Sequence, residues 1–423
     1  MKKILILLAI FIMFPLTTLA SSNTQAKVGG KYFDNLSDAI ISANSTDTIT
    51  LLSNVTLEKE LLINKEIHID LNGNNIESDS NVFLVENGAL YITGKGTLKE
   101  NKPNYGAIKV FGSTTKTNEK YSVVDIGKDV TLIGWAGIFI SQKENKSYGV
   151  SVDFRGNIKA ISDISGGEGI GIYVNGNIKD KEGAPIVNVL DGANIVSNGN
   201  GLYIGGYGTF NIKDGYIEGD QSGIAIKAGK LTIDGGTIEC NGPDTTPTEG
   251  YNNGVNASGA AIQIESNTGY AGDIELTINN GNIISKNSNV IYEYIGKGSS
   301  TTVKEIKLNG GTFKSDAKKD VFLLSNSFKS KHPKFISGGE YSSNPNEYLL
   351  SGYSSNLEDG MYTITKTTMS EVLFKTSSSS KNYTFPIIIT LLLISITLIY
   401  FNREKPFIKN ILKKVNLWYN QFR

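Results

Sequence analysis

The chain has 423 residues, 41 of them Lys or Arg and 41 Asp or Glu, so its formal net charge is zero. Between residues 21 and 402 there are 33 basic and 40 acidic side chains, and this mild acidity excludes the dense positive surface that nucleic acid or a polyanionic glycan requires. A single cysteine excludes an internal disulfide.

The first residues predict a secretory signal peptide (1–20). Two lysines after Met1 precede an apolar run from Ile4 to Leu16, and a small-residue cleavage sequence ends at Ala20. The only cysteine, Cys240, lies far from this site, which excludes a lipoprotein. We therefore expect an exported protein.

A two-turn helix is expected shortly after this leader. One face carries four apolar residues at the spacing i, i+3, i+4 and i+7, namely Leu36, Ala39, Ile40 and Ala43. Asn35 is placed to cap the helix, with Asp38 three residues on. We expect the helix to cover the open end of the strands that follow, since unpaired strand edges promote aggregation.

Most of the chain then repeats one short phrase: alternating apolar residues, then Asn-Gly, Asp-Gly or Gly-Gly, then another apolar residue. The copies include LTIDGGTIE from Leu231, LTINNGNII from Leu276, IKLNGGTFK from Ile306, FNIKDGYIE from Phe210, IYVNGNIK from Ile172 and VDFRGNIK from Val152. Alternation predicts a short strand with one buried face, and the glycine allows the sharp corner that follows it. Such strands cannot bury their apolar faces alone, so they must stack as a β-solenoid. Ile233 and Ile278 occupy matching positions and are predicted to point into its core.

The spacing of the corner glycines indicates coils of irregular length. Five of them recur about 16 to 23 residues apart, at Gly156, Gly176, Gly192, Gly215 and Gly236. Later intervals are longer, which predicts insertions at corners, the longest being Asn241–Ser258. This irregularity argues against a hexapeptide-repeat solenoid, and the lack of a helical half-repeat argues against leucine-rich repeats. We expect roughly 11 to 15 coils, stacked about 4.8 Å apart.

Two stretches resemble a known group of proteins. Lys31–Ile76 places a short helix before strands that end in a DLNG corner, and Phe335–Lys366 (FISGGEYSSNPNEYLLSGYSSNLEDGMYTITK) resembles a closing segment. Both are similar to the pectate-lyase-like β-helical surface proteins of Gram-positive bacteria. The resemblance implies an all-β fold, a right-handed parallel β-helix over 28–366 with a short N-terminal capping helix. It does not imply one function, because this fold carries lyases, hydrolases, adhesins and inert stalks.

The C-terminal part predicts attachment to a membrane. Residues 367–382 are rich in serine and predict a flexible tether. Tyr383–Phe401 is a run of 19 uncharged residues and predicts one transmembrane helix. Six Lys or Arg residues and only one acidic residue, Glu404, follow this run. The excess of positive charge predicts that the tail lies in the cytoplasm. That tail (402–423) has the pattern of a basic amphipathic helix lying on the anionic inner leaflet, with docking to a membrane partner as the alternative. No LPxTG-like motif precedes the span, so we expect a single-pass membrane protein with an extracellular N-terminal domain.

Catalytic motifs of the resembling enzymes are missing from this chain. Lyases of that fold use an Arg or Lys base near calcium-binding carboxylates, and the only arginine before the tail, Arg155, is best explained as an exposed structural residue. The hydrolases use paired aspartates with Gly-His-Gly and Arg-Ile-Lys, and the chain has none of these strings. His68 is expected to point outward from a strand, and Cys240 has no cationic neighbour that would activate its thiol. We expect no metal and no cofactor.

Aromatic residues near the coil faces suggest a binding surface instead, because aromatic rings stack on sugars. The candidates are Trp135, Tyr173, Tyr203, Tyr207 and Tyr216. The alternative is that tyrosines simply favour strands. The sequence therefore favours a cell-surface adhesin or glycan-binding stalk whose partner is an extracellular glycan or the surface of a host or neighbouring cell. A surface polysaccharide lyase or glycosidase with a dispersed carboxylate and lysine site, and a structural spacer, remain the alternatives.

Overall fold

The computed structural model describes residues 24–102, 105–162, 168–176, 178–246, 257–266, 270, 273–296 and 302–367, together with 405, 406, 409, 410, 413 and 414 in the tail. The predicted signal peptide (1–20), transmembrane helix (383–401), and most of the tether and tail lie outside these residues. Within the described part of the chain, no helix is long and apolar enough to cross a membrane. The described residues up to Thr365 belong to one compact unit.

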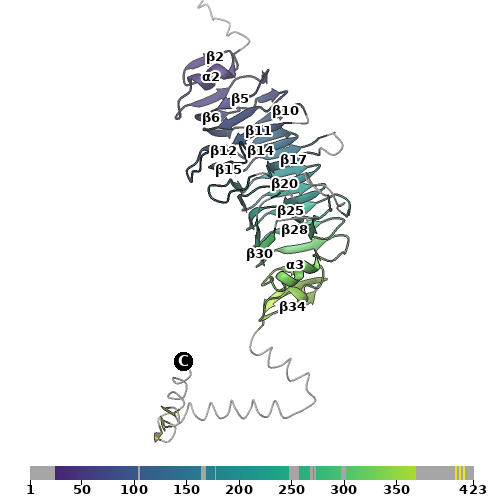
Figure 1. The fold of residues 1–423 in the computed structure, drawn as a ribbon. Coiled ribbons are helices and arrows are strands. Elements are labelled where there is room, and N and C mark those ends of the chain that lie inside the picture. Colours follow the sequence, from purple (N-terminus) through teal and green to yellow (C-terminus); the bar gives the residue numbers. More distant parts are fainter. Residues whose placement is uncertain are drawn as a thin grey trace, which may run out of the picture. The chain divides into compact units, whose positions relative to one another are not determined.

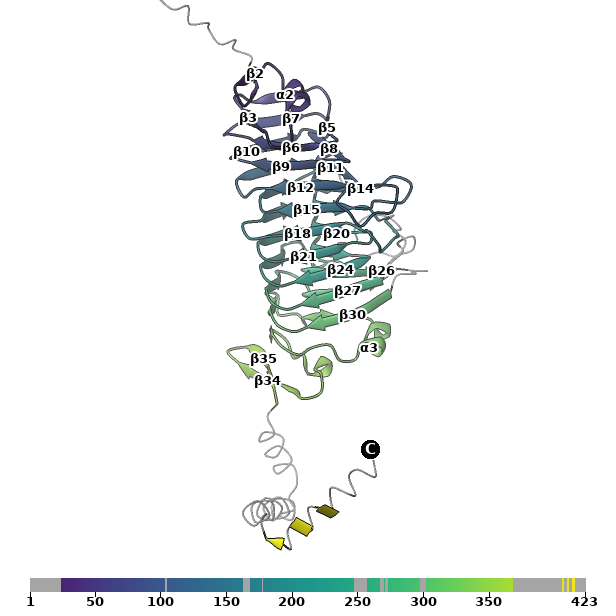
Figure 2. The ribbon, with the colours of Figure 1, turned by 90° about the vertical axis from the view of Figure 1, so that its left-hand side faces the viewer.

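This unit is a stack of coils, each contributing one strand to each of three sheets, A, B and C (Figures 1 and 2). In sheet order, sheet A contains β2 (Lys31–Phe33), β1 (Ala26–Val28), β3 (Thr48–Leu51), β6 (Glu66–Asp70), β9 (Ala89–Thr93), β12 (Ser122–Ile126), β15 (Val150–Phe154), β18 (Ile186–Val189), β21 (Thr209–Ile212), β24 (Gly229–Ile233), β27 (Asp273–Ile278) and β30 (Thr302–Leu308). From β3 onward these strands pair in parallel.

Sheets B and C complete the coil. Sheet B contains β34 (Tyr353–Glu358), β35 (Met361–Lys366), β33 (Glu340–Tyr341), β31 (Thr312–Ser315), β28 (Asn282–Ser285), β25 (Thr237–Cys240), β22 (Tyr216–Gly219), β19 (Asn194–Ser197), β16 (Asn157–Ala160), β13 (Val130–Gly134), β10 (Gly96–Glu100), β7 (Asn75–Ser78) and β4 (Val55–Leu57). Sheet C contains β32 (Phe322–Leu323), β29 (Ile291–Ile295), β26 (Ile262–Ser266), β23 (Ser222–Ile226), β20 (Asn200–Ile204), β17 (Ile170–Val174), β14 (Ala136–Ser141), β11 (Gly106–Phe111), β8 (Phe83–Glu86) and β5 (Leu61–Ile63). The expected parallel β-helix is confirmed. Among the described residues, sheets A, B and C contain 12, 13 and 10 strands; without the end strands β1, β2, β34 and β35 the stack has 10 strands in A, 11 in B and 10 in C, at the lower edge of the 11 to 15 coils expected.

The core is a set of apolar columns that run along the stack. Ile233 and Ile278 are partners on neighbouring strands and both are fully buried, as predicted. In sheet B one inward column continues through Ile158, Ile195, Ile217, Ile238, Ile283, Phe313 and Tyr341. Because strands in register place like residues above one another, the period-two pattern of each phrase becomes one continuous core.

Glycines occupy the corner from sheet A to sheet B, as the repeated phrase predicts. Gly215 and Gly236 have φ values of 103° and 80°, and a Cβ on Gly236 would lie 2.5 Å from the carbonyl oxygen of Gly215. Only glycine fits both the positive φ and the close approach of the next coil. Gly176 differs, because it follows β17 at the corner from sheet C to sheet A. Gly156 and Gly192 are consecutive corners from sheet A to sheet B. The two intervals that Gly176 separates in the sequence therefore belong to one long coil and not to two.

Caps close both ends of the stack, at the ends where Figure 1 labels α2 and β34. The predicted N-terminal helix is α2 (Leu36–Ser42), and the Asn35 side chain accepts a hydrogen bond of 2.8 Å from the backbone N–H of Asp38. Its apolar face is buried, as expected. At the other end the predicted closing segment contains β33, which pairs antiparallel with β35, and the 3-10 helix η1 (Asn346–Tyr348). One further cap element, the helix α3 (Asn326–Lys331), was not predicted from the sequence; it buries Phe328.

Candidate ligand-binding surface

The outward face of sheet C carries one column of side chains in register along the stack. From the N-terminal end the column contains Leu62, Leu84, Lys109, Phe139, Tyr173, Tyr203, Ala225, Gln263, Tyr292 and Leu323. Neighbouring positions are one strand spacing, about 4.8 Å, apart. Three of the five aromatic candidates, Trp135, Tyr173 and Tyr203, lie on or beside this column.

Trp135, Phe139 and Tyr173 form what we call the aromatic strip. The ring centroids of Phe139 and Tyr173 are 4.8 Å apart, and that of Trp135 lies 5.6 Å from Tyr173 and 6.1 Å from Phe139. Trp135 extends from the turn between β13 and β14, whereas Phe139 and Tyr173 belong to β14 and β17. All three side chains are half-buried, so each ring is held by its neighbours and still reaches solvent.

Lysine side chains border the strip on its N-terminal side. The Nζ atom of Lys109 lies 5.5 Å from the ring centre of Phe139 and 5.0 Å from that of Phe111. Lys143 approaches the same Phe111 ring at 4.9 Å and forms an ion pair of 2.5 Å with Glu86. Aromatic faces and cationic hydrogen-bond donors therefore lie together on this part of sheet C.

A buried carboxyl group lies behind the strip. Glu100 is 4 % exposed, and its Oε2 accepts a hydrogen bond of 3.2 Å from the backbone N–H of Trp135. Its Oε1 has no hydrogen-bond partner within the described residues. Burial raises the pKa of Glu100 to about 7, because the charged form loses its water. The carboxyl thus fixes the turn that presents Trp135.

Tyr203 continues the column but is closed off from solvent. Its ring stacks on Tyr173 at 5.1 Å with an interplanar angle of 16°, and it is 1 % exposed. Tyr270, from the corner between β26 and β27, covers it and shares a hydroxyl–hydroxyl hydrogen bond of 2.6 Å. The Nζ of Lys227 lies 5.1 Å from the Tyr203 ring centre and 4.6 Å from that of Tyr270. Burial raises the pKa of Tyr203 well above its usual value. In this arrangement Tyr203 supports Tyr173 and does not face a ligand.

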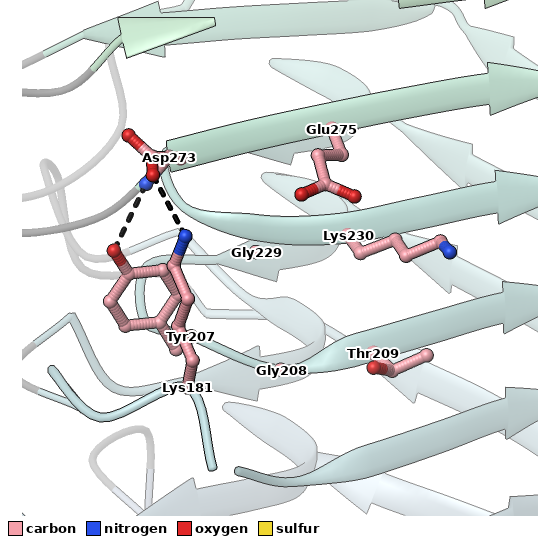
Figure 3. Close-up of a pocket in the computed structure, with 8 residues that line it drawn as sticks. All are labelled: Lys181, Tyr207, Gly208, Thr209, Gly229, Lys230, Asp273 and Glu275. Atoms are coloured by element: carbon pink, nitrogen blue, oxygen red, sulfur yellow. Dashed lines mark hydrogen bonds and ion pairs between the residues drawn. The ribbon is translucent and has the colours of Figure 1, made fainter. Parts of the chain in front are cut away.

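Tyr207 lies in a separate groove at the corner between sheets C and A (Figure 3). The groove has a volume of about 140 Å³ and is lined by Lys181, Tyr207, Gly208, Thr209, Gly229, Lys230, Asp273 and Glu275. Lys181 forms an ion pair of 2.8 Å with Asp273 and lies 5.3 Å from the Tyr207 ring centre. The Tyr207 hydroxyl accepts a hydrogen bond from the backbone N–H of Asp273. Tyr207 therefore helps to build the corner.

The fifth candidate, Tyr216, is not brought together with the others. It lies on β22 of sheet B, and its hydroxyl donates a hydrogen bond of 2.5 Å to Glu218. Burial and this carboxylate raise the pKa of Tyr216. The structure thus divides the five candidates into the strip, its buried support, the corner groove and a different sheet.

Phe139, Phe111 and Lys109 belong to this surface, yet the sequence analysis did not select them. Their outward orientation could have been predicted, since the alternation in AGIFI (136–140) and AIKVF (107–111) turns these side chains outward. What was missing was the register, which alone shows that Phe139 lies between Lys109 and Tyr173.

The residues that were weighed for catalysis occupy structural positions. Arg155 forms an ion pair of 2.8 Å with Asp125, and His68 points outward and stacks on Tyr91 at 4.5 Å. Cys240 is buried, and burial raises the pKa of its thiol to about 12. Among the described residues no group of His, Cys, Asp and Glu is arranged to hold a metal ion.

Comparisons of the chain with models of protein families, with curated proteins and with solved structures find no match.

Proposed function

We propose that this chain is a cell-surface interaction protein whose β-helix binds a glycan along the outer face of sheet C. The observation that carries the proposal is the aromatic strip. Trp135, Phe139 and Tyr173 are half-buried there, and their ring centroids lie within 6.1 Å of one another. Rings that are already packed lose little conformational entropy on binding, and their faces suit the apolar side of a sugar ring.

The finer assignment comes from the sequence. We propose a right-handed helix of the pectate-lyase-like type, from a surface protein similar to those of Gram-positive bacteria. The leader 1–20 would export it, the span Tyr383–Phe401 would anchor it, and the tail 402–423 would lie on the inner leaflet. The glycan partner would then belong to a host cell or a neighbouring cell, which is the role of an adhesin or glycan-binding stalk.

A lyase or glycosidase needs a carboxylate and a base that a polysaccharide can reach. On the outer face of sheet C, Lys227 and Glu265 form an ion pair of 3.1 Å, but both side chains are 0 % exposed, so a polymer on this surface would not contact them. Lys143 and Glu86 form an ion pair of 2.5 Å beside the strip, and their side chains are 43 % and 27 % exposed. The lyase or glycosidase therefore stays the alternative to a binding protein.

A glycan array with the soluble fragment 21–375 tests the proposal, followed by an assay for newly released reducing ends on every glycan that binds. Binding without release supports the adhesin. Release of reducing ends supports the polysaccharide lyase or glycosidase, and the absence of both supports a structural spacer.

A further inference from the structure

Four polar side chains are buried together at the outer face of sheet C, beneath Tyr270. Lys227 directly follows β23, Gln263 and Glu265 lie on β26, and Ser258 precedes β26. The exposed fractions of Lys227, Gln263 and Glu265 are 0 %, and that of Ser258 is 1 %. Ile226 pairs with Ile264 in the parallel register, which brings Lys227 opposite Glu265, and Ala225 on the same strand pairs with Gln263. The coil stack thus places a primary amine beside a carboxylate and a carboxamide in a dry site.

The hydrogen bonds of this cluster connect the amine, the carboxylate and the amide in one chain. Glu265 Oε1 lies 3.1 Å from Lys227 Nζ. The other oxygen, Glu265 Oε2, accepts a hydrogen bond of 3.1 Å from the amide nitrogen Nε2 of Gln263. The Ser258 hydroxyl donates a hydrogen bond of 2.7 Å to the amide oxygen Oε1 of Gln263. One carboxylate therefore contacts both a nucleophilic nitrogen and a nitrogen that can leave, while a hydroxyl polarises the carbonyl between them.

We propose that Lys227 and Gln263 join in an intramolecular isopeptide bond, with Glu265 as the catalytic residue. A buried Lys–Glu pair is costly to maintain, because both ions have lost their hydration. Conversion of the amine to a neutral amide removes that cost. The reacting groups are held by a folded scaffold, so the reaction has the advantage of intramolecular proximity. The Ser258 hydroxyl stabilises negative charge on the amide oxygen as the tetrahedral intermediate forms.

The step balances without any other reactant. Lys227 transfers one proton to Glu265 Oε1, and the free amine forms a bond from Nζ to the carbonyl carbon Cδ of Gln263. The bond between Cδ and Nε2 then breaks. Nε2 receives the proton that Glu265 holds and leaves as ammonia, and Nζ then gives a second proton to Glu265. The products are a Lys–Gln amide, ammonia and a protonated Glu265, all of them neutral, and no oxidation or reduction occurs.

This bond would connect two neighbouring coils across the longest corner insertion, Asn241–Ser258. Strands on successive coils are otherwise held by backbone hydrogen bonds and side-chain packing. A covalent link between residues 227 and 263 constrains the unfolded chain in the way a disulfide does. It would do so in a chain whose only cysteine cannot form an internal disulfide.

Mass spectrometry of the intact full-length chain, purified in detergent, tests the proposal. The expected mass is lower than that of the processed sequence by about 17 Da, the mass of one ammonia. Protease digestion should then yield a branched peptide that joins the segment around Lys227 to the segment around Gln263. An unchanged mass overturns the proposal, and so does a loss of ammonia that maps to other residues. A loss of about 18 Da with a Lys227–Glu265 link would also overturn it, because water would then have left instead of ammonia.

Matched variants separate the cluster from other lysines. Lys227→Met and Glu265→Gln should each have the full mass, the first because the nucleophile is gone and the second because the proton carrier is gone. The control variant Lys181→Met removes a lysine that forms an ion pair with Asp273 and whose side chain is 58 % exposed. This variant should still show the mass loss of about 17 Da. A cross-link that persists in Glu265→Gln at the wild-type level would overturn the catalytic role of Glu265. The wild-type mass decides whether the bond exists even if these variants fail to fold.

Discussion

Whether an aromatic side chain on sheet C can meet a ligand depends on its neighbours in the column. Tyr173 lies between Phe139 and Tyr203 and keeps part of its surface in solvent. Tyr203 has Ala225 on its other side, and the space above this small residue is filled by Tyr270 and Lys227. Two tyrosines in identical strand positions therefore differ in exposure because of one alanine and the two side chains that pack above it.

At the residue scale, the first prediction concerns glycan binding. Trp135→Ala and Tyr173→Ala should each weaken binding of the array-selected glycan about tenfold or more, since buried aromatic anchors dominate such interfaces. Isothermal titration calorimetry with the fragment 21–375 measures the change. Tyr216→Ala removes a half-buried tyrosine from sheet B and should bind as the wild type does. Equal losses for all three variants would contradict a binding site on sheet C.

The second prediction at this scale concerns Glu100. Its pKa in the folded protein is raised from 4.5 to about 7, so the folded state binds a proton between these values that the unfolded state has released. The contribution of Glu100 to stability is therefore most favourable below pH 4.5 and is lost as the pH rises through about 7. Glu100→Gln imitates the protonated form and should raise the free energy of unfolding at pH 8 by about 1 to 3 kcal/mol.

Chemical denaturation at pH 8 and pH 5 measures this effect. The gain from Glu100→Gln should shrink at pH 5, where the wild-type carboxyl in the folded state is mostly protonated. Glu58→Gln changes an exposed carboxylate and serves as the control, with no gain expected at either pH. A gain of the same size at both pH values would show that ionisation of Glu100 is not its cause.

At the scale of elements, short strands acquire their stability from the strands above and below. The strand β24 has only five residues, but its partners β21 and β27 continue four of its five columns on both sides. The caps follow the same logic, because α2 and the antiparallel strands β33 and β35 cover coils that have a neighbour on one side only. A strand phase that is wrong by one residue would therefore disturb several coils at once.

The third prediction tests this phase on β27. Ile278→Asp places a charge in the fully buried core column and should lower the free energy of unfolding by about 4 kcal/mol. Thr277→Asp, the matched control, changes the adjacent half-buried side chain that points outward and should cost much less. Thermal melting followed by circular dichroism measures both. Equal melting temperatures for the two variants would mean that the inward and outward faces are reversed.

At the scale of the whole molecule, the charge distribution agrees with the proposed layout. The cations of the last residues follow the uncharged run Tyr383–Phe401, whereas the part before that run has an acidic excess. Lys409, Asn410, Lys413 and Lys414 are helical and exposed in the described part of the tail. The membrane anchor itself stays a prediction from the sequence.

The fourth prediction tests that anchor. Protease added to intact cells should remove the coil stack and leave a small fragment that carries a C-terminal tag. Truncation before Ser377 should release the protein into the medium, and deletion of 406–423 should leave it anchored, because the apolar span provides most of the insertion energy. Immunoblots of cells and medium measure all three. Release of the full-length protein by cell-wall hydrolases, and not by detergent, would instead indicate a covalent wall linkage.

The sequence by itself determined the properties that depend on neighbouring residues. Alternation and Gly corners identified the stacked strands, the burial of Ile233 and Ile278, and the phase of His68, because each strand's two faces are set by its own period of two. The i, i+3, i+4 pattern and Asn35 likewise predicted α2 before any contact was known.

Only the tertiary structure decided which distant residues meet. Corner insertions vary in length, so the sequence could not assign Gly176 to its corner or place Phe139 between Lys109 and Tyr173. The same register brings Lys227 to Glu265 across 38 positions and buries both. Backbone hydrogen bonds between strands of neighbouring coils set that register, and it cannot be predicted from the local sequence pattern.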